Sequence, residues 1–500
     1  MVKLRKFFYY FFVLVFIILT AVPLVSCESN ELEKVSKKLT TYAIDAVVSD
    51  DKTITASENV TYVNTTGKKL SKIYFHLYPR AFRQDASFKP YTSLTLDSCF
   101  PSGISYGDIE ILSASAGGQK VEFALVGSDE DILEIPLNQE LSSGSKIDIL
   151  IDFNLTIPCC THRLGYYEKN INLGNWYPVV CPFIGGDFDK SPYYSTGDPF
   201  CSEIANYNVK IAYPSQYLLS STGTEISSNN GAQKVSTITA KAVRDFAVNL
   251  SEDTAKISKQ VGKIRVCYVG YKSDENFEKY LDVSARAIEF FNRIFGVYPY
   301  EIITVVKMPF IYGGMEYPNI VFVSDSVTEE SEKLKVIVHE IAHQWWYGVV
   351  GNNEITEAWL DESLAEYSVA LFFKNNPEFE IKYDDLVKDA ISSYMLYVDV
   401  IKTIRGEVNT KMNLPVNEYQ NDYEYSYMVY IKGVIMFDEL SKTVGDKKVI
   451  DGLKKYYKDN KFKIATKDDF YKAFSSACHK DLKNFFDGYL YGTTIISKIN

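Results

Sequence analysis

The sequence predicts an α+β protein of several domains, in which a β-rich N-terminal part is followed by an α-rich part with a small sheet. From about residue 40 to about residue 255, short apolar or alternating runs are separated by turn residues, which is typical of strands and hairpins. From about residue 256 onward, apolar residues recur at helical spacing over long stretches. A composition with 46% hydrophobic and 14% aromatic residues is sufficient for large cores.

The charge balance excludes one class of partner. The formal net charge is −11 over 500 residues. A protein that holds nucleic acid through its phosphates needs a basic surface, so this balance argues against a nucleic-acid partner. It is compatible with any ordinary enzyme and identifies no function by itself.

The N-terminus has the pattern of a targeting segment. A basic stretch, MVKLRK, precedes the apolar run FFYYFFVLVFIILTAVP. The next residues, LVSC, resemble the signal of bacterial lipoproteins, which implies removal of a signal peptide, residues 1–26, and attachment of lipid to Cys27. An uncleaved membrane anchor is the alternative. In both cases we expect the bulk of the protein to lie outside the cytoplasm, anchored to the cell membrane.

The β-rich domain is expected to span residues 40–255, after a short charged tether at residues 27–39. The strand-like runs are YAIDAVVSD, TITASENVTYVN, KIYFHLYP, KIDILIDFNLTI, NYNVKIAYP, KVSTITAKAV and RDFAVNL. Residues 158–203 are dense in Pro, Gly, Tyr, Trp and Cys, and we expect long ordered loops there. Four of the eight cysteines lie in this stretch, where an exported protein could form a disulfide. None of the cysteines forms a CxxC pair, so a zinc ribbon has no support.

The α-rich domain is expected to span residues 256–500. A strand, KIRVCYVGY, and a helix over SDENFEKYLDVSARAIEFFNRIFG come first, and two strands then flank IYGGMEYP. Helices follow over EKLKVIVHEIAHQWWYG, over TEAWLDESLAEYSVALFFKN, and several times more from about Asp384 to the end.

Residues 336–348, VIVHEIAHQWWYG, carry two of the five histidines. On a helix, His339 and His343 lie one turn apart on the same face, so both imidazoles can reach a single ion. Glu340, between them, is placed to take a proton from water activated by that ion. A motif this short also occurs by chance, so a third ligand is needed to support a metal site.

Glu362 is the candidate third ligand. It lies nineteen positions after His343, in TEAWLDESLAEYS, and the intervening loop contains Gly348, Gly351 and two asparagines that can turn the chain back. The residues around Glu362 are largely apolar, and an unpaired carboxylate in a core would be costly. A metal ion removes that cost. Two imidazoles and a carboxylate favour zinc, with one position left for water.

These motifs resemble the zinc aminopeptidases of the aminopeptidase N type, gluzincins with HExxH, eighteen residues and then Glu. Gly313-Gly314-Met315-Glu316 resembles the family's G-x-M-E-N motif, and Tyr430-Ile431-Lys432-Gly433 its Y-x-K-G motif. The resemblance implies a saddle-like β domain followed by a thermolysin-like catalytic domain that binds one Zn²⁺ ion. The chain resembles a short member that lacks the C-terminal domains of the larger relatives.

The resemblance also implies a role for each motif. Glu316 would bind the free α-ammonium of a peptide, while the backbone of Gly313, Gly314 and Met315 lies beside the substrate. Tyr317 departs from the family's Asn, which leaves substrate alignment open. Family members complete the amine site with a residue of the N-terminal domain, and the sequence alone does not identify which residue has that role here.

Several assignments keep their alternatives. Tyr430 is the candidate stabiliser of the oxyanion because Lys432-Gly433 follows it, and Tyr427, one turn earlier, is its rival. Glu366 could hydrogen-bond a ligand histidine or face solvent. The other histidines, His76, His162 and His479, lack ligand spacing, and we expect structural or surface positions for them.

The predicted activity is zinc-dependent hydrolysis of the first peptide bond of peptides with a free N-terminus, by attack of a zinc-bound water and outside the cytoplasm. Two alternatives remain. One is an endopeptidase with the same zinc core, which the motif around Glu316 disfavours. The other is a non-catalytic peptide-binding lipoprotein.

Overall fold

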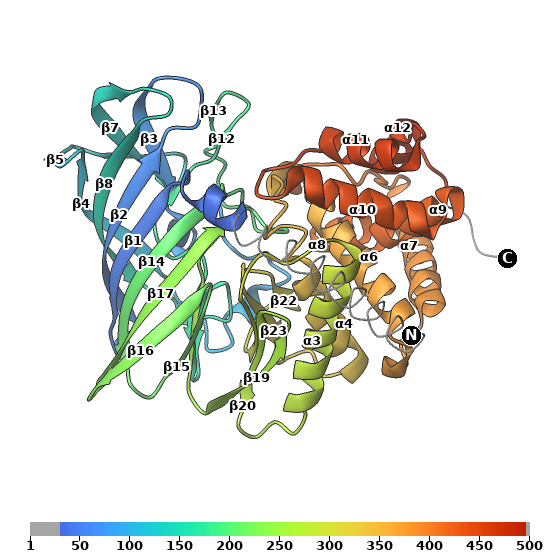
Figure 1. Ribbon diagram of the computed structural model, residues 1–500, viewed down its shortest axis with the longest axis horizontal. Coiled ribbons are helices and arrows are strands. Elements are labelled where there is room, and N and C mark those ends of the chain that lie inside the picture. The colour runs from blue at the N-terminus through green and yellow to red at the C-terminus, as the bar shows by residue number, and fades with distance from the viewer. Residues whose placement is uncertain (1–30, 497–500) are drawn as a thin grey trace, which may run out of the picture.

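A computed structural model describes residues 31–496. A β-rich half, on the left of Figure 1, is followed by an α-rich half on the right. The predicted fold class is confirmed. Cys27 and the apolar N-terminal run lie outside the described residues. Within the described range, no helix has the length and apolar character that a bilayer crossing requires.

The largest sheet of the β-rich half has eight strands in the order β16-β17-β14-β1-β2-β8-β4-β5. Alternate residues of its long strands are buried, as in β1 and β2, because successive side chains of a strand point to opposite faces. Its strands are β1 (Thr41–Val48), β2 (Thr53–Val63), β4 (Asp108–Ala116), β5 (Gln119–Lys120), β8 (Lys146–Thr156), β14 (Ala205–Pro214), β16 (Thr224–Asn230) and β17 (Gln233–Val243).

Three smaller sheets complete this half, in the orders β15-β18-β10-β9, β11-β3-β7-β6 and β12-β13. Their strands are β3 (Leu70–His76), β6 (Ala124–Val126), β7 (Ile132–Leu141), β9 (Leu164–Tyr167), β10 (Asn170–Leu173), β11 (Val179–Val180), β12 (Phe183–Ile184), β13 (Asp187–Phe188), β15 (Leu218–Ser221) and β18 (Val248–Ser251). Short helical segments are η1 (Tyr78–Phe82) and α2 (Leu96–Cys99). The expected loop region therefore contains five short strands, β9 to β13.

The sheet of the α-rich half has the order β19-β20-β21-β23-β22. The strands β20, β21 and β23 are parallel neighbours, and β22 pairs antiparallel with β23 at the edge of the sheet. The five strands are β19 (Thr254–Val261), β20 (Ile264–Tyr271), β21 (Ile302–Met308), β22 (Gly314–Met315) and β23 (Ile320–Ser324). The free edge of β22 faces the active-site cavity described below, whose lining includes Gly313 and Gly314.

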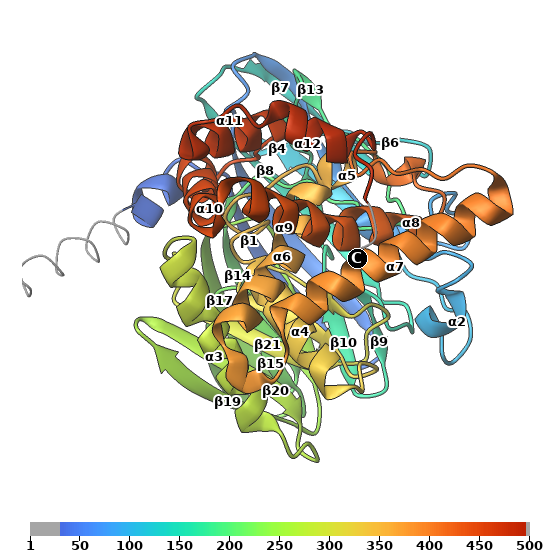
Figure 2. The same ribbon diagram turned by 90° about the vertical axis from the view of Figure 1, so that its right-hand side faces the viewer.

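Helices form the rest of the α-rich half (Figures 1 and 2). They are α3 (Phe277–Ile294), α4 (Glu330–Ala342), α5 (Glu354–Glu357), α6 (Trp359–Asn375), η2 (Pro377–Phe379), α7 (Tyr383–Arg405), η3 (Val416–Glu418), α8 (Asp422–Ser426), the π-helical turn η4 (Tyr427–Ile431), α9 (Lys432–Val444), α10 (Asp446–Asn460), α11 (Lys467–Cys478) and α12 (Lys483–Leu490). Helix α4 packs against α3 on one side and α6 on the other.

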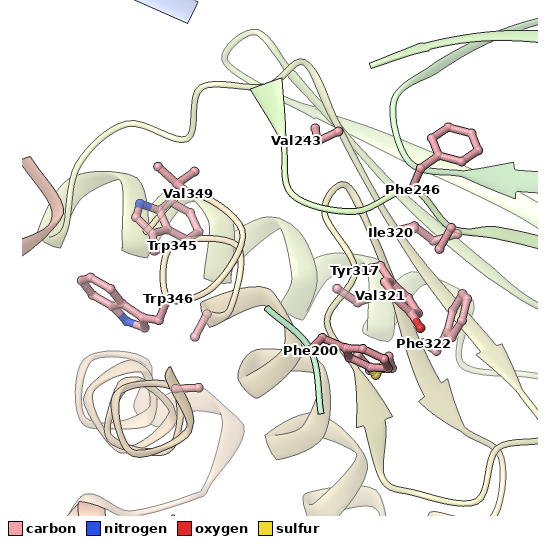
Figure 3. Packing of buried hydrophobic residues seen from close by; sticks show 14 of the residues in the cluster. Phe200, Val243, Phe246, Tyr317, Ile320, Val321, Phe322, Trp345, Trp346 and Val349 are labelled. Atoms are coloured by element: carbon pink, nitrogen blue, oxygen red, sulfur yellow. The ribbon is translucent and has the colours of Figure 1, made fainter. Parts of the chain in front are cut away.

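One hydrophobic core runs through both halves. Figure 3 draws Phe200, Val243 and Phe246 of the β-rich half together with Tyr317 and Phe322 of the other half, and all five are buried members of the same cluster. The tryptophans of the HEIAHQWWYG stretch, Trp345 and Trp346, belong to this cluster as well. Two halves that share a core of this kind are expected to hold a fixed relative position, which matters because the active site draws residues from both.

The tether and the cysteines differ from what the sequence predicts. Residues 31–36, part of the expected tether, are helical, and Glu33 forms an ion pair with Lys241 at 2.8 Å while Glu31 pairs with Lys461. This part is fastened to the folded protein rather than extended. The seven cysteines of the described range are all free thiols, so the suggested disulfide is not formed in this structure.

Candidate metal centre and active-site cleft

Two helices bring the predicted ligands together. His339 lies in the last turn of α4, and His343 caps its C-terminal end. The loop that follows returns the chain so that Glu362 lies in the first turn of α6. The Nε2 atoms of the two histidines are 3.0 Å apart, and each is 3.2 Å from Oε2 of Glu362. The structure thus places all three residues at one point, as the spacing in the sequence predicts.

The three donor atoms fit a tetrahedral metal ion. Ligand atoms at about 2.0–2.1 Å from a tetrahedral zinc ion lie about 3.3 Å from one another, close to the separations found here. The side chains of His343 and Glu362 are almost fully buried, so an ion there would be held away from bulk water. Two nitrogen donors and one oxygen donor, with one side open to a cavity, match the ligand set of catalytic zinc sites.

Neighbouring groups orient the two imidazoles. Nδ1 of His343 lies 2.9 Å from the carbonyl oxygen of Trp346, so it donates a hydrogen bond there and leaves Nε2 free for a metal. Nδ1 of His339 lies 3.3 Å from Oε1 of Glu366. Of the two predicted positions for Glu366, the structure thus has the one in which it faces a ligand histidine, and the residue also lines the cavity.

Glu340 lines the cavity beside the ligands. Burial, together with the nearby carboxylates of Glu362 and Asp198, raises its pKa to about 7. Its Oε2 atom is buried without a hydrogen-bond partner among the described residues, so it is available to a substrate or a water. A Cβ atom on Gly314 would lie 2.1 Å from Oε1 of Glu340, so the absence of a side chain at residue 314 makes room for this carboxylate.

The Gly-Gly-Met-Glu stretch forms the edge of the small sheet. Gly313, Gly314 and Glu316 line the cavity, whereas Met315 is buried against Arg163. Oε1 of Glu316 is buried without a partner among the described residues. Burial and the neighbouring Asp198 carboxylate raise the pKa of Glu316 well above its usual range. A cationic ligand at this position would donate hydrogen bonds to the unpartnered oxygen and would offset the repulsion between the two carboxylates.

Tyr430, and not its rival Tyr427, reaches the metal centre. The phenol of Tyr430 donates a hydrogen bond of 2.5 Å to Oε1 of Glu362, and its ring stacks on the ring of His339. Tyr427 points elsewhere and stacks on Tyr397 of α7. Both residues lie in the π-helical turn η4, a rare distortion that is frequent at functional sites because it changes which side chains face a given direction.

The rest of the Tyr-Ile-Lys-Gly motif supports this turn. The buried Lys432 donates hydrogen bonds to the carbonyl oxygens of Thr410 and Tyr489, at 2.5 and 2.9 Å. Burial lowers its pKa to about 7. A Cβ atom on Gly433 would lie 2.5 Å from the side chain of Ser363, so only glycine allows α9 to approach α6 this closely next to Glu362.

The β-rich half supplies two residues that sequence reasoning missed. Asp198, in the loop before β14, offers an oxygen within 4.8 Å of carboxylate oxygens of Glu316 and Glu362. Arg163, in the loop before β9, is buried, pairs with Asp198, and donates to Sδ of Met315 at 3.1 Å. Both line the cavity. Neither lies in a sequence pattern that marks it, and the only signal was its position in the Pro-, Gly- and Cys-rich stretch.

Tyr317, the departure from the family's motif, ties the two halves together. It is fully buried, and its phenol donates a hydrogen bond of 2.8 Å to Oδ1 of Asn175. A Cβ atom on Gly174 would lie 2.0 Å from this phenol oxygen, so a glycine is required at residue 174. The side chain thus stabilises the contact between the Asn-Trp-Tyr-Pro loop and the segment that carries Glu316.

One cavity of about 620 Å³ has Asp198, Glu316, His339, Glu340, Glu362 and Tyr430 in its lining. Its floor is acidic and polar, with Glu316, Glu340 and Glu362, and its walls include apolar side chains of α6, α7 and α9. The remaining histidines lie elsewhere: His76 and His162 are buried, as expected of structural histidines, and His479 ends α11.

Comparison with known proteins agrees with this geometry. A sequence profile described as the peptidase family M1 domain matches residues 279–489, which include all three metal ligands, Glu340, Glu316 and Tyr430. Over these residues the chain is similar to the peptidase family M1 domain. The resemblance to the aminopeptidase N type is confirmed.

Relatives of the M1 domain include aminopeptidase N of Lactococcus lactis subsp. lactis, 28% identical over 240 residues, which are 44% of this chain and 27% of that protein. Aminopeptidase 2 of Candida albicans is 21% identical over 407 residues, 76% of this chain and 42% of the relative. The chain thus spans less than half the length of these relatives. The M1 zinc metallopeptidase of Deinococcus radiodurans has the same fold, with a TM-score of 0.65 at 14% identity, over 93% of this chain and 96% of that one.

Proposed function

We propose that the protein is a zinc aminopeptidase that removes the N-terminal residue of peptides. The proposal rests on the observation that two sets of groups, a candidate metal site and a cluster of buried carboxylates, adjoin each other at one cavity. One set, His339, His343 and Glu362, fits a zinc ion and lies beside Glu340. The other set, Glu316 and Asp198, adjoins the first and leaves a buried carboxylate oxygen without a partner. The first set suits hydrolysis, and the second suits recognition of an ammonium group.

The metal would be held by the Nε2 atoms of His339 and His343 and by Glu362. The chemistry that zinc supplies at such a site is Lewis acidity toward the scissile carbonyl and toward water. Glu366 and the carbonyl oxygen of Trp346 keep the two imidazoles oriented, which maintains the ligand geometry.

Glu340 acts as the general base and then as the general acid. A base works best when its pKa is near the working pH, and burial has brought the pKa of Glu340 to about 7. Its unpartnered Oε2 accepts the proton of the attacking water, and the protonated carboxyl then transfers it to the nitrogen of the leaving peptide. The free energy cost of burying this carboxylate therefore has a catalytic use.

Tyr430 stabilises the negative charge that develops on the carbonyl oxygen. Its phenol now donates to Glu362, so the hydroxyl lies at the metal centre and can turn its hydrogen to a substrate oxygen. The stacking of its ring on His339 holds the phenol in place before substrate arrives. A preorganised donor of this kind is worth about 3–4 kcal/mol of transition-state stabilisation.

Glu316 and Asp198 bind the α-ammonium group of the substrate. The ammonium supplies three donors to a site with a surplus of carboxylate oxygens, so binding neutralises charges that repel each other. The free edge of β22 lets the first residues of the peptide pair with the backbone of Gly313 and Gly314. Binding of the N-terminus thereby fixes which peptide bond lies at the metal centre. In support, a structure of the Deinococcus radiodurans relative is described as bound to a Tyr-Ser-Ala substrate.

We also propose that the protein acts outside the cytoplasm, attached to the membrane through lipid on Cys27. The support is the sequence alone, a basic and apolar N-terminus followed by LVSC. Metabolic labelling with a radioactive fatty acid should mark the wild-type protein in the membrane fraction and should leave a Cys27→Ser variant unlabelled. Label on the variant would contradict attachment at this residue.

The enzymatic proposal is tested with aminoacyl anilides, which release a chromophore when the first amide is cleaved. The wild-type protein should hydrolyse them, a chelator should abolish the activity, and added Zn²⁺ should restore it. The Glu340→Gln variant, which keeps the metal ligands, should bind zinc normally and lose roughly three orders of magnitude in kcat. Full activity of this variant would contradict the role of Glu340. Cleavage of N-acetylated substrates as fast as free ones would indicate an endopeptidase.

A further inference from the structure

Helix α7 forms one wall of the active-site cavity. Leu386, Asp389, Ala390 and Ser393 line the cavity from this helix. The face that packs against the rest of the protein is a different one, because its buried residues are Val387, Ile391 and Tyr394. Figure 2 shows α7 crossing the α-rich half, with its C-terminal end at the edge of the molecule.

The cavity-lining face of α7 continues beyond the cavity as an exposed apolar stripe. We define this stripe as Leu396, Val400 and Ile404, whose exposed fractions are 64%, 43% and 72%. With about 3.6 residues per turn, Ile404 lies five turns after Leu386 and Val400 nearly two turns after Ser393, so these residues share one side of the helix. A solvent-facing helix side is normally polar, and aligned exposed apolar residues indicate a binding surface.

The stripe is connected to the catalytic residues by stacked aromatic side chains. Tyr397, between the stripe residues in sequence, stacks on Tyr427 with ring centroids 4.3 Å apart and an interplanar angle of 15°. Tyr427 begins the π-helical turn that also carries Tyr430, whose phenol contacts Glu362. Tyr423, one turn before Tyr427, is 63% exposed and extends this apolar border. The π-helical turn and the aromatic stack thus connect the metal centre to the part of α7 that carries the stripe.

We propose that the stripe binds apolar side chains of long peptide substrates, on the C-terminal side of the cleaved bond. The inference rests on the proposed function and names its substrate class: peptides that are longer than the cavity and carry apolar residues beyond it. A helix rises about 1.5 Å per residue, so Ser393 and Ile404 are about 16 Å apart along α7. An extended peptide covers that length with about five residues.

A polypeptide substrate is the occupant that the geometry favours, because the stripe is the same helix face that lines the catalytic cavity. A substrate held by its ammonium group at Glu316 and paired with β22 has its remaining residues in the cavity, one wall of which is formed by α7. Extra apolar contacts there strengthen binding of both substrate and transition state, so they raise kcat/KM without changing the chemistry at the metal centre.

The test compares two peptides of about twelve residues with the same first six residues. One has apolar residues in its second half, and the other has serine and asparagine there. A short aminoacyl anilide reports on the catalytic centre alone. The stripe variant carries Leu396→Ser, Val400→Ser and Ile404→Ser. The control variant carries Lys388→Ser, Asp399→Ser and Lys402→Ser, which alter exposed residues on the opposite side of the same helix.

The wild-type protein should hydrolyse the apolar peptide with a kcat/KM roughly tenfold above that of the polar peptide. The stripe variant should lose this preference and keep its activity on the anilide, while the control variant keeps both. A wild-type protein without the preference, or a stripe variant that retains it, would overturn the proposal.

Other occupants of the stripe give distinct results. If the wild-type protein is a dimer that the stripe variant converts to a monomer in analytical ultracentrifugation, the stripe is a self-association surface and the proposal is wrong. The same conclusion follows if the stripe variant loses binding to vesicles of anionic phospholipid. If the wild-type protein does not cleave the anilide, the proposed function fails. Binding of the fluorescein-labelled apolar peptide, followed by anisotropy, then decides on the stripe independently.

Discussion

The two walls of the cleft are built in different ways. One wall carries the three candidate metal ligands together with Glu340 and Tyr430, on helices α4 and α6 and the turn η4, all within the residues that match the M1 domain. The other wall consists of loops of the β-rich half that contribute Asp198 and Arg163. Helical spacing along one chain segment fixes the first wall, whereas the second exists only when distant segments have folded against each other.

This difference separates hydrolysis from recognition. The helical wall carries the three metal ligands, Glu340 and Tyr430, which are the residues that a hydrolytic metal centre needs. The loop wall adds a buried carboxylate next to Glu316, and in the proposed mechanism this charge selects a free amine. Changes to the helical wall should therefore abolish the reaction, while changes to the loop wall should alter which substrates react or how firmly the halves are joined.

The largest effect is expected from Glu362→Gln, in the helical wall. The substitution replaces an anionic ligand by a neutral one, so zinc content after dialysis should fall well below one ion per chain and activity should drop by roughly a thousandfold or more. Plasma mass spectrometry measures the metal. In the matched variant, Glu366→Gln, the three ligands remain and only the contact with Nδ1 of His339 changes, so we expect a loss of about 10–100-fold. Equal losses in the two variants would contradict the assignment of Glu362 as a ligand.

The next effect concerns the junction between the walls. Arg244, after β17, is fully buried and donates to the carbonyl oxygens of Tyr347, Ser202 and Lys463. Its side chain also fills the space that the missing Cβ atom of Gly351 leaves open. Tyr347 itself has a φ of 123°, a strained backbone that these contacts hold next to the second ligand histidine.

We expect Arg244→Met to lower the free energy of unfolding by about 3 kcal/mol, because three buried carbonyl groups lose their donor. Denaturant titration measures this change, and activity of the folded fraction should fall as well. The control is Arg265→Met, at an exposed position on β20, which should have little effect. Unchanged stability of Arg244→Met would show that the halves are held together without this residue.

A smaller effect is expected from Asp198→Asn, in the loop wall. Loss of one carboxylate from the amine site should raise KM for free-amine substrates by roughly tenfold, the value of one charge-assisted hydrogen bond, while zinc content stays at one ion per chain. The control, Asp422→Asn, changes a cavity acid that accepts hydrogen bonds from Thr92 and Thr196 instead, and KM should change little. An unchanged KM in Asp198→Asn would exclude this residue from the amine site.

The smallest effect lies in the β-rich half, away from both walls. Glu58 of β2 is fully buried between β1 and β8, and both its oxygens lack a partner among the described residues. Burial raises its pKa well above the ordinary value. Because the folded-state pKa lies above the unfolded one, stability is greatest at acidic pH and falls as the pH rises through the folded-state pKa.

Glu58→Leu should therefore stabilise the protein by about 1–2 kcal/mol, and the gain in melting temperature should be larger at about pH 9 than at about pH 6. Thermal unfolding followed by circular dichroism measures both. The control is Glu110→Leu, at an exposed position on β4, which should show no such dependence. A gain that did not grow with pH would mean that Glu58 is already ionised in the folded protein at about pH 6, which would contradict a strongly raised pKa.

The sequence predicted the helical wall almost completely. His339, His343 and Glu362 could be found because ligands on helices follow the period of the helix, and the loop between them contains residues that permit a turn. Most long strands were predicted from alternation as well, but β4, β7 and β19 were not, since their runs have weaker alternation or are interrupted by proline. Choosing Tyr430 over Tyr427 depended on the resemblance, because the π-helical turn that separates them has no local signature.

The loop wall could not be predicted. Arg163 and Asp198 are 35 positions apart, with the short strands β9 to β13 between them, and only tertiary contacts bring their side chains to Met315 and Glu316. The role of Tyr317 could not be predicted for the same reason. Its phenol bonds to Asn175 and occupies the place that a Cβ atom of Gly174 would take, and both residues belong to the other half. Residues that act through contacts between domains leave no periodic pattern in a single sequence.

Product analysis tests most directly whether the two walls together make an aminopeptidase. A peptide of about ten residues is incubated with the zinc-loaded protein, and the products are sequenced over time by mass spectrometry. Our account predicts a series of peptides that are shortened by one residue at a time from the N-terminus, and an intact peptide when that N-terminus is acetylated. Internal fragments, or equal cleavage of the acetylated peptide, would contradict recognition of the free amine at Glu316 and Asp198.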